Sequence, residues 1–302
     1  MPERIRIVFL GTGSVAPTPE RNHTGILFTY KDENILIDCG ENIQRQFKIA
    51  GLNAFKLTRI FLTHWHGDHV LGLGGLLQSL ALGKYSKTLE IYGPRGTKKF
   101  MKNLLNMFIF VDKINMKVIE IEKEGNFLET KDLIFKCKKL VHSTFSLGYS
   151  VIEKDKLRIS KEFLNKNKIK ESQELGKLVE GKDIKINGKI IRAKDATFLE
   201  KGRKITIILD TGYMLNISKF AENSDLLITE CSFCDESKEK AKECFHLTAK
   251  QAAEIAKNSR STSLILTHIG QRYQKHINFI SEEAKKIFKN TKIAEDFMEI
   301  LL

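Results

Sequence analysis

Residues 64–69 read HWHGDH, and this stretch decides how the rest of the chain is interpreted. It contains three imidazoles and one carboxylate, which are ordinary ligands of Zn²⁺ and related metals. The whole chain of 302 residues has only eight histidines, so a solvated loop that collects three of them by chance is a poor explanation. The stretch therefore predicts a metal site.

The neighbouring residues predict a strand before this stretch and a helix after it. Residues 59–63 form a short apolar, β-branched run, as in a buried strand. Residues 70–82 have helical character, and Gly72, Gly74 and Gly75 in the first turns would let the backbone approach whatever the histidines hold. We expect a tight strand-to-helix turn that points several side chains at one spot.

Composition bounds the class of protein. Hydrophobic residues make up 42% of the chain, enough for one large domain or two smaller ones. The first residues lack the apolar run of a signal peptide, and no stretch approaches the roughly 18 apolar residues that a membrane span needs. Five cysteines without framework spacing indicate a reducing compartment. We expect a cytoplasmic protein with no membrane segment.

The charge balance favours a polyanionic partner. Lys and Arg number 50 against 37 acidic residues, a net charge of +13, although a generally basic surface would give the same total. The excess is concentrated, because residues 153–204 contain 16 basic and 9 acidic residues. This stretch predicts a projection that binds RNA or DNA through phosphates, with a disordered surface loop as the alternative.

Part of this basic stretch has a pattern of local structure. Residues 183–191 read DIKINGKII, which predicts a hairpin with Asn187-Gly188 at its turn. The stretch contains only two aromatic residues, Phe163 and Phe198. We expect an excursion from the main domain that is too polar to carry a core of its own.

Elsewhere strands and helices alternate along the chain. Strands are expected at 5–10, 25–30, 34–38, 89–92, 205–209, 226–229 and 264–267, and helices at 41–50, 97–110, 215–222, 248–258 and 281–289. Two β-rich halves with helices between their strands predict an α/β protein in which two stacked sheets are covered by layers of helices.

A glycine-rich segment after the first strand resembles a dinucleotide-binding motif. Residues 11–16 match G-x-G-x-x-A, and Asp38 stands about where a ribose-binding acid would be. Pro17 and Pro19 follow at once, and a helix does not run through such a sequence. We therefore reject a nucleotide site here.

A cysteine pair suggests a second metal motif. Cys231 and Cys234 form one CxxC, with Cys244 and His246 behind it. A structural zinc site usually needs two ligand pairs at defined spacing. We interpret the cysteines as ordinary reduced side chains.

Three further candidate ligands follow apolar runs. His142, Asp210 and His268 come after residues 140–141, 205–209 and 264–267. A lone His or Asp after a strand is usually a cap or a surface group. Together with the HWHGDH stretch, however, they make five histidines and two aspartates, enough for two metals with an open position.

These motifs, in this order, resemble the metallo-β-lactamase superfamily and its H-x-H-x-D-H signature. The chain is similar in particular to the short tRNase Z enzymes, which remove 3′ trailers from precursor tRNA. The supporting segments are PTPERN at 17–22, GPRG at 93–96, HLT at 246–248 and ILTHIGQR at 265–272. The resemblance implies one αββα sandwich over 1–302, in which 153–200 form an inserted tRNA-binding arm, here without the family's Gly-Pro element.

The resemblance also implies a site, a cofactor and an assembly. Two Zn²⁺ per subunit are implied, the first held by His64, His66 and His142, the second by Asp68, His69 and His268, with Asp210 bridging them. The implied catalytic residues are Asp68, which orients the nucleophile, the general acid His246 and its partner Glu230. Arg21, Asn22, Arg272 and the arm residues Lys177 and Lys182 are implied contacts of precursor tRNA. The family further implies a homodimer in which one subunit's arm presents tRNA to the other subunit's site.

Other functions remain open from the sequence. A hydrolase of the same fold that acts on a small ester or thioester would use a similar metal centre but leaves the basic arm unexplained. A non-catalytic RNA-binding module would need neither seven ligands nor a spare acid. For His246 the alternative is a residue that simply precedes a helix capped by Thr248.

Overall fold

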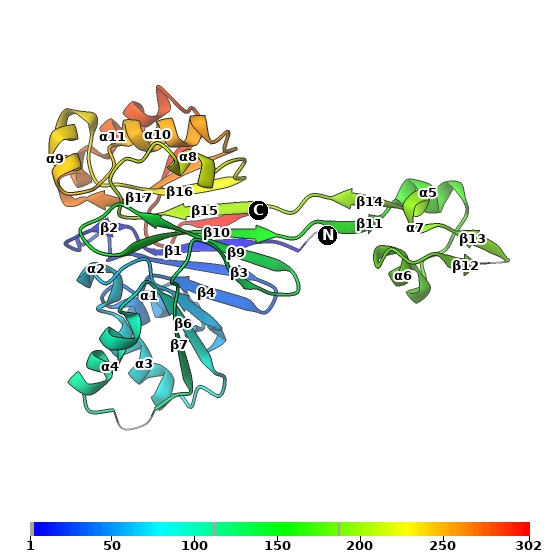
Figure 1. Cartoon of the computed structure of the whole chain (residues 1–302), viewed down its shortest axis with the longest axis horizontal. Coiled ribbons are helices and arrows are strands. Elements are labelled where there is room, and N and C mark those ends of the chain that lie inside the picture. The colour runs from blue at the N-terminus through cyan, green and yellow to red at the C-terminus, as the bar shows by residue number, and fades with distance from the viewer. Residues whose placement is uncertain (1–2, 111–112, 187) are drawn as a thin grey trace.

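Two β-sheets stack face to face in the computed structural model, which describes residues 3–110, 113–186 and 188–302 (Figure 1). The first sheet has the order β19-β1-β3-β4-β5-β6-β7 and the second the order β18-β17-β16-β15-β10-β9-β8. The strands of the first are β1 (Arg6–Gly11), β3 (Gly25–Tyr30), β4 (Glu33–Ile37), β5 (Arg59–Phe61), β6 (Leu89–Gly93), β7 (Met116–Glu120) and β19 (Glu299–Leu301). Those of the second are β8 (Gly125–Glu129), β9 (Leu133–Leu140), β10 (Ser146–Glu153), β15 (Lys204–Ile208), β16 (Leu226–Cys231), β17 (Leu264–Gly270) and β18 (Thr291–Ile293).

Both sheets are mixed, with parallel and antiparallel pairs of strands. Strands β4 to β7 run parallel in the first sheet, as do β15 to β18 in the second. Strand β10 pairs antiparallel with both β9 and β15. The end of β9, the start of β10 and the end of β15 therefore share one edge of the second sheet.

Aromatic side chains between the sheets hold the start of the HWHGDH stretch. Phe61, the last residue of β5, has its ring centroid 5.4 Å from that of Phe135 and 5.3 Å from that of Tyr149, both from the other sheet. The Tyr149 hydroxyl donates a hydrogen bond of 2.6 Å to the carbonyl of Leu62. The core thus fixes the backbone two residues before His64.

Helices cover the outer face of each sheet and complete the predicted αββα order (Figure 1). The first sheet is covered by α1 (Ile43–Ile49), α3 (Leu73–Leu82) and α4 (Thr97–Met107), and the second by α8 (Ile217–Phe220), α10 (Ala249–Asn258) and α11 (Ile277–Lys285). Within the described ranges, no helix combines the length and apolar character that crossing a membrane requires.

The helix expected at 70–82 differs from the prediction. It consists of α2 (Gly67–Val70) and α3, which are separate helices. A Cβ atom at Gly72 would lie 2.0 Å from the carbonyl oxygen of Gly40, and one at Gly75 would lie 2.5 Å from the amide nitrogen of Gln44. We expected these glycines to let the backbone approach whatever the histidines hold, but what they allow is close packing of α3 against neighbouring chain.

The two rejected motifs have ordinary structural roles. After β1 the chain turns into β2 (Gly13–Ser14), which pairs with β17, and no helix begins within residues 11–24, all of which the structure describes. Cys231 and Cys234 are buried in the hydrophobic cluster beneath α10.

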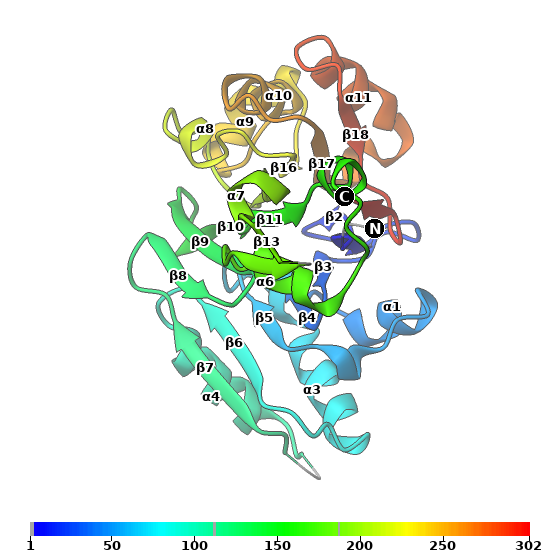
Figure 2. The same ribbon diagram turned by 90° about the vertical axis from the view of Figure 1, so that its right-hand side faces the viewer.

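Residues 153–200, here called the arm, leave the body as a pair of strands (Figures 1 and 2). Strand β11 (Lys156–Ile159) pairs antiparallel with β14 (Thr197–Glu200). Beyond them lie α5 (Lys161–Lys166), α6 (Gly176–Val179), α7 (Ala193–Ala196) and a hairpin of β12 (Ile184–Ile186) and β13 (Lys189–Ile191). The predicted hairpin is confirmed, although Asn187 in its turn lies outside the described residues.

The arm contains a hydrophobic core, so the prediction that it is too polar for one was wrong. Its buried side chains are Leu164, Leu175, Leu178, Ile184, Ile191, Ala193 and Ala196. The apolar residues are few and widely spaced in the sequence, and only the folded backbone brings them together.

We expect Leu178→Ala to loosen the arm without destabilising the body. Leu178 is fully buried, and removing such a side chain usually costs about 2–5 kcal/mol, a large loss for so small a core. Limited proteolysis should cut the arm faster, while the main thermal transition stays in place. Val179→Ala, at a neighbouring position that is 38% exposed, is the control. Equal proteolysis of the two variants would contradict an independent arm core.

Candidate metal centre

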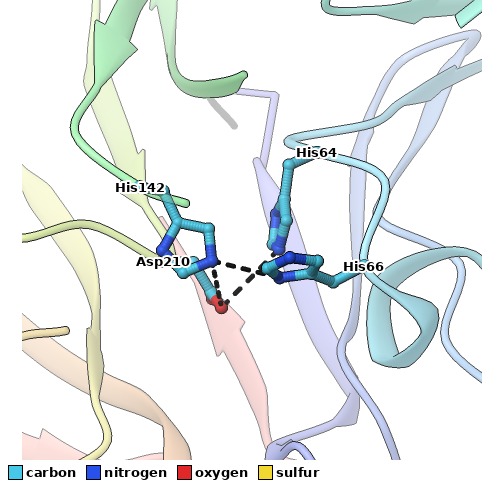
Figure 3. Close-up of side chains that lie close together, drawn as sticks. All are labelled: His64, His66, His142 and Asp210. Atoms are coloured by element: carbon cyan, nitrogen blue, oxygen red, sulfur yellow. Dashed lines mark hydrogen bonds and ion pairs between the residues drawn. The ribbon is translucent and has the colours of Figure 1, made fainter. Parts of the chain in front are cut away.

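All seven predicted ligands converge at the edge where the sheets meet the loops. His64 and the residues after it follow β5, His142 lies in the β9–β10 turn, and Asp210 follows β15. Ligand atoms within 4.8 Å of one another form the groups His64, His66, His142 and Asp210; Asp68, His69 and His268; and Asp210, His246 and His268. Figure 3 shows the four side chains of the first group pointing toward one another.

Asp210 offers one carboxylate oxygen to each of the first two groups. Its Oδ2 lies 3.7 Å from His64 Nε2 and 3.8 Å from His142 Nε2. Its Oδ1 lies 3.3 Å from both His69 Nε2 and His268 Nε2. This is the arrangement that a carboxylate bridging two metal ions requires.

Two buried polar atoms at the centre have no hydrogen-bond partner within the described residues. His64 Nε2 and Asp210 Oδ1 are buried and have no partner in the described part of the chain. Each such atom costs about 1–3 kcal/mol when it stays unsatisfied. Because imidazole nitrogens and carboxylate oxygens are preferred zinc ligands, the donor set fits the two metal ions that the family implies.

The backbone is distorted where it presents two of the inner residues. The pairing of β16 with β17 shifts between Glu230 and Cys231, and His268 is the extra residue in β17. His268 and Asp38 both have left-handed backbone angles, with φ of 54° and 57°. A bulge of this kind redirects a side chain, and such strain is typical of functional sites.

A second layer of hydrogen bonds orients the histidine rings. Asp38 Oδ2 accepts from His69 Nδ1 at 2.6 Å, and the carboxylate is held by the backbone N–H and hydroxyl of Thr63, each at 2.7 Å. His142 Nδ1 donates to the carbonyl of Phe245 at 3.2 Å. These bonds leave the Nε2 atoms of both rings facing the centre, as ligands must. This role of Asp38 was not predicted from the sequence, although Asp38 is the last residue of a predicted strand.

Burial and charge set the protonation of the centre. Burial lowers the pKa of His64 well below its ordinary value, which keeps the ring neutral and its lone pair available. Burial alone would raise the pKa of Asp210, but His268, His69 and His64 outweigh it and hold that pKa well below its ordinary value. Burial alone would lower the pKa of His69, but Asp210 and Asp38 outweigh it and raise that pKa well above its ordinary value, so a metal bound at His69 has to displace a proton.

His246 and Glu230 form a pair next to the ligands. His246 Nδ1 lies 3.0 Å from both carboxylate oxygens of Glu230, which is fully buried. Burial lowers the pKa of His246, but Glu230 outweighs it and raises the pKa to about 9. The His246 ring centroid lies 5.3 Å from that of His142 and 5.7 Å from that of His268. Thr248 caps α10 with Gln251, as the alternative for His246 supposed, but the contact with Glu230 gives His246 more than a place before that helix.

Arg21, one of the residues expected to contact tRNA, is buried in the structure. Arg21 is only 6% exposed, and its guanidinium donates to the Thr12 hydroxyl, the carbonyl of Ala294 and the side chain of Gln274. The side chain ties loop 17–22 to Thr12 and to the carbonyl of Ala294, and its expected contact with tRNA stays a prediction.

The remaining expected contacts lie closer to solvent. The Asn22 amide is held by the carbonyls of His23 and Glu41, so it too stabilises the loop. Arg272 is exposed, with its guanidinium 5.2 Å from the centroid of the Phe233 ring. Lys177 and Lys182 are exposed on the arm, and Lys182 pairs with Glu180 at 2.8 Å.

Comparison with known proteins gives relatives over nearly the full chain. A ribonuclease Z of Methanothermobacter thermautotrophicus is 36% identical, covering 98% of this chain and 96% of the relative. A ribonuclease Z of Archaeoglobus fulgidus is 38% identical, covering 98% and 97%. The chain belongs to the ribonuclease Z family. Over residues 5–174 it also belongs to the family whose model is described as Anti-Pycsar protein Apyc1, a match that ends before Asp210 and His268.

Solved structures agree with this membership. Human tRNase Z, short form (ELAC1), is 28% identical with a TM-score of 0.69, covering 98% of each chain. YhfI of Bacillus subtilis, a metallo-β-lactamase fold protein, shares the fold at 20% identity with a TM-score of 0.73, covering 99% of this chain and all of that one. The full-length relatives make this ribonuclease Z an endoribonuclease, which decides against the small-ester hydrolase and the non-catalytic module.

We expect Asp38→Asn to weaken metal binding by this ribonuclease Z about 10- to 100-fold, the usual effect of losing an outer partner of a ligand. Asn keeps an acceptor for Thr63 and tolerates the left-handed backbone, so the fold should survive. Zinc affinity is measured by competition with a chromophoric chelator. Asp32→Asn, at an exposed turn, is the control. An unchanged affinity in Asp38→Asn would remove Asp38 from the metal centre.

Proposed function

We propose that this ribonuclease Z uses two zinc ions per subunit to remove the 3′ trailer of precursor tRNA near the discriminator nucleotide, leaving a 3′-hydroxyl on the tRNA. The observation that carries the proposal is the position of Asp210, with one oxygen toward each group of histidines and with His246 beside them. The names of the relatives, ribonuclease Z and tRNase Z, support the RNA substrate.

The proposed ligands follow the two groups of side chains. His64, His66 and His142 would hold one ion, Asp68, His69 and His268 the other, and Asp210 both. Bound there, the ions supply positive charge that activates water and neutralises the phosphate in the transition state. The Asp68 carboxylate accepts a hydrogen bond from the backbone N–H of Val15 at 3.0 Å, which fixes its direction. We assign Asp68 a second role, orienting the attacking water.

His246 is the proposed general acid. Cleavage that leaves a 3′-hydroxyl on the tRNA breaks the bond between phosphorus and the 3′ oxygen, and that oxygen needs a proton as it departs. Glu230 holds Nδ1 of His246, so Nε2 is the atom free to donate the proton. The pKa of about 9 keeps the imidazole protonated at neutral pH.

We expect His246→Ala to slow cleavage of precursor tRNA by about 10²- to 10⁴-fold, the usual contribution of a general acid. A substrate with sulfur in place of the 3′ bridging oxygen should recover most of this loss, because a thiolate leaves without protonation. Single-turnover rates on the two substrates give the comparison.

His276→Ala is the matched control, since His276 is exposed and lies outside the ligand groups of the described chain. It should cleave both substrates as the wild type does. If His246→Ala slowed the sulfur and oxygen substrates equally, His246 would not be the acid.

The arm is the proposed tRNA-binding element. Its residues 153–200 include 13 basic and 9 acidic side chains, and Lys177 is exposed on it. It leaves the body where β10 ends and β15 begins, while His142 and Asp210 lie at the opposite ends of the same strands. In Figure 1 the arm accordingly projects from the side opposite α2 and β2. Because the arm and the metal centre face opposite ways, we propose that the arm of one subunit holds the tRNA that another subunit cleaves.

We therefore also propose a homodimer. Leu71, Phe108 and Ile109 near the start of α3 and the end of α4 are 60%, 46% and 96% exposed. Phe108 lies against α3, as a Cβ atom at Gly74 would be 3.0 Å from its ring. A group of exposed apolar side chains is typical of a protein interface.

Deleting the distal arm should impair tRNA binding and spare small phosphodiesters. The deletion removes residues 160–196 and joins β11 to β14 with Asn-Gly, since Ile159 pairs with Thr197 and a two-residue turn closes such a pair. We expect a raised KM for precursor tRNA and unchanged hydrolysis of bis(p-nitrophenyl) phosphate. Equal loss on both substrates would contradict a tRNA-specific arm.

A mixing experiment tests whether the arm acts between subunits. The arm-deleted variant has an intact site, and Asp68→Ala has an intact arm. If the arm works across a dimer, a mixture allowed to exchange subunits should cleave precursor tRNA faster than either variant alone. No gain, in a mixture shown by native mass spectrometry to contain mixed dimers, would contradict the proposed assembly.

A further inference from the structure

Two hollows lie beside the candidate metal centre, one lined by His142 and the other by His246. The larger has a volume of about 1030 Å³ and is lined by the ligand His142, the turn after it, and residues of the loop before α4 and of β9. The smaller, of about 370 Å³, is lined by His246, Phe233 and Arg272. The centroids of the His142 and His246 rings are 5.3 Å apart, so the two hollows are neighbours.

Because His246 is the proposed general acid, the two hollows should bind different parts of the precursor tRNA. The proton from His246 goes to the 3′ oxygen of the tRNA, so the nucleotide carrying that oxygen lies on the His246 side. The rest of the cleaved strand, joined to phosphorus through its 5′ oxygen, is then left for the His142 side. This step rests on the proposed function, because it needs the bond that leaves a 3′-hydroxyl on the tRNA.

We infer that the larger hollow binds the single-stranded 3′ trailer, and that Phe145 stacks on a trailer base next to the cleaved bond. Phe145 lines the hollow and is 61% exposed, only three residues after His142. Val141, on the other side of His142, also lines it and is 44% exposed. Aromatic side chains stack on any base, which suits trailers of different sequence. The volume exceeds what a drug-sized ligand usually needs, so it accommodates more than one nucleotide.

The charges around this hollow suit a phosphate backbone. Arg95 and Lys139 line it, are exposed and have no ion-pair partner among residues 3–110, 113–186 and 188–302. The Glu120 carboxylate accepts hydrogen bonds from the backbone N–H groups of Gly96 and Lys98, which offsets its charge. Glu122 is the other acid in the lining. Grooves that bind single-stranded nucleic acid usually combine basic side chains with aromatic rings on which bases stack, and Arg95, Lys139 and Phe145 provide both here.

A substrate–variant cycle tests the inference. Precursor tRNAs are made with a normal trailer, with abasic nucleotides at the first trailer positions, and with an abasic discriminator nucleotide. Single-turnover kcat/KM is measured for the wild type, Phe145→Ala and Phe145→Trp. Loss of one stacked base corresponds to about a 5- to 100-fold fall.

We expect Phe145→Ala to lose this factor on the normal trailer and to lose nothing more on the abasic trailer, while Phe145→Trp keeps the wild-type rate. The effect of the abasic discriminator should be the same in all three proteins. Phe279→Ala is the matched control, because Phe279 is also 61% exposed but lies on α11.

Other outcomes would overturn the inference in distinct ways. Equal loss on normal and abasic trailers would make Phe145 a structural residue. Coupling to the abasic discriminator instead of the trailer would reverse the assignment of the two hollows. A wild type that leaves the normal precursor tRNA uncut would overturn the proposed function itself, whereas cleavage without trailer coupling overturns only the role of Phe145.

Discussion

The burial of Asp210 among imidazoles is the interaction on which the rest of the site depends. An isolated carboxylate in such a place would be very costly, and it is stable here because His64, His69 and His268 surround it. His64 lies in the loop after β5, His69 in α2 and His268 in β17, so both sheets must end at the same place. The charged groups of the centre therefore meet only if the two sheets are packed correctly.

The cost of assembling this centre is offset in the surrounding structure. Asp38 and His268 adopt left-handed backbone angles that side chains seldom take, and a bulge in β17 carries the second of them. Thr63 holds the Asp38 carboxylate, and the aromatic core anchors the strand just before it. Strain at the centre is tolerated because a large, well-packed core lies directly behind it.

Chemistry and substrate recognition are separated along the same two strands. One end of the β10–β15 pair leads to His142 and Asp210, and the other leads into the arm. Because the arm has its own small core, it can hold a fixed shape far from the site. The proposed single-strand binding at the centre and the proposed tRNA binding by the arm would thus depend on one continuous piece of sheet.

The sequence by itself determined which residues are candidate ligands, because HWHGDH and the polar residues after apolar runs are local patterns with a direct chemical meaning. It also predicted the layered sheets and the basic arm. Only the tertiary structure decided that Arg21 is buried, that Asp38 orients a ligand, and that scattered leucines of the arm form a core. Those roles depend on contacts between residues far apart in the chain, and such contacts exist only once the two sheets have packed.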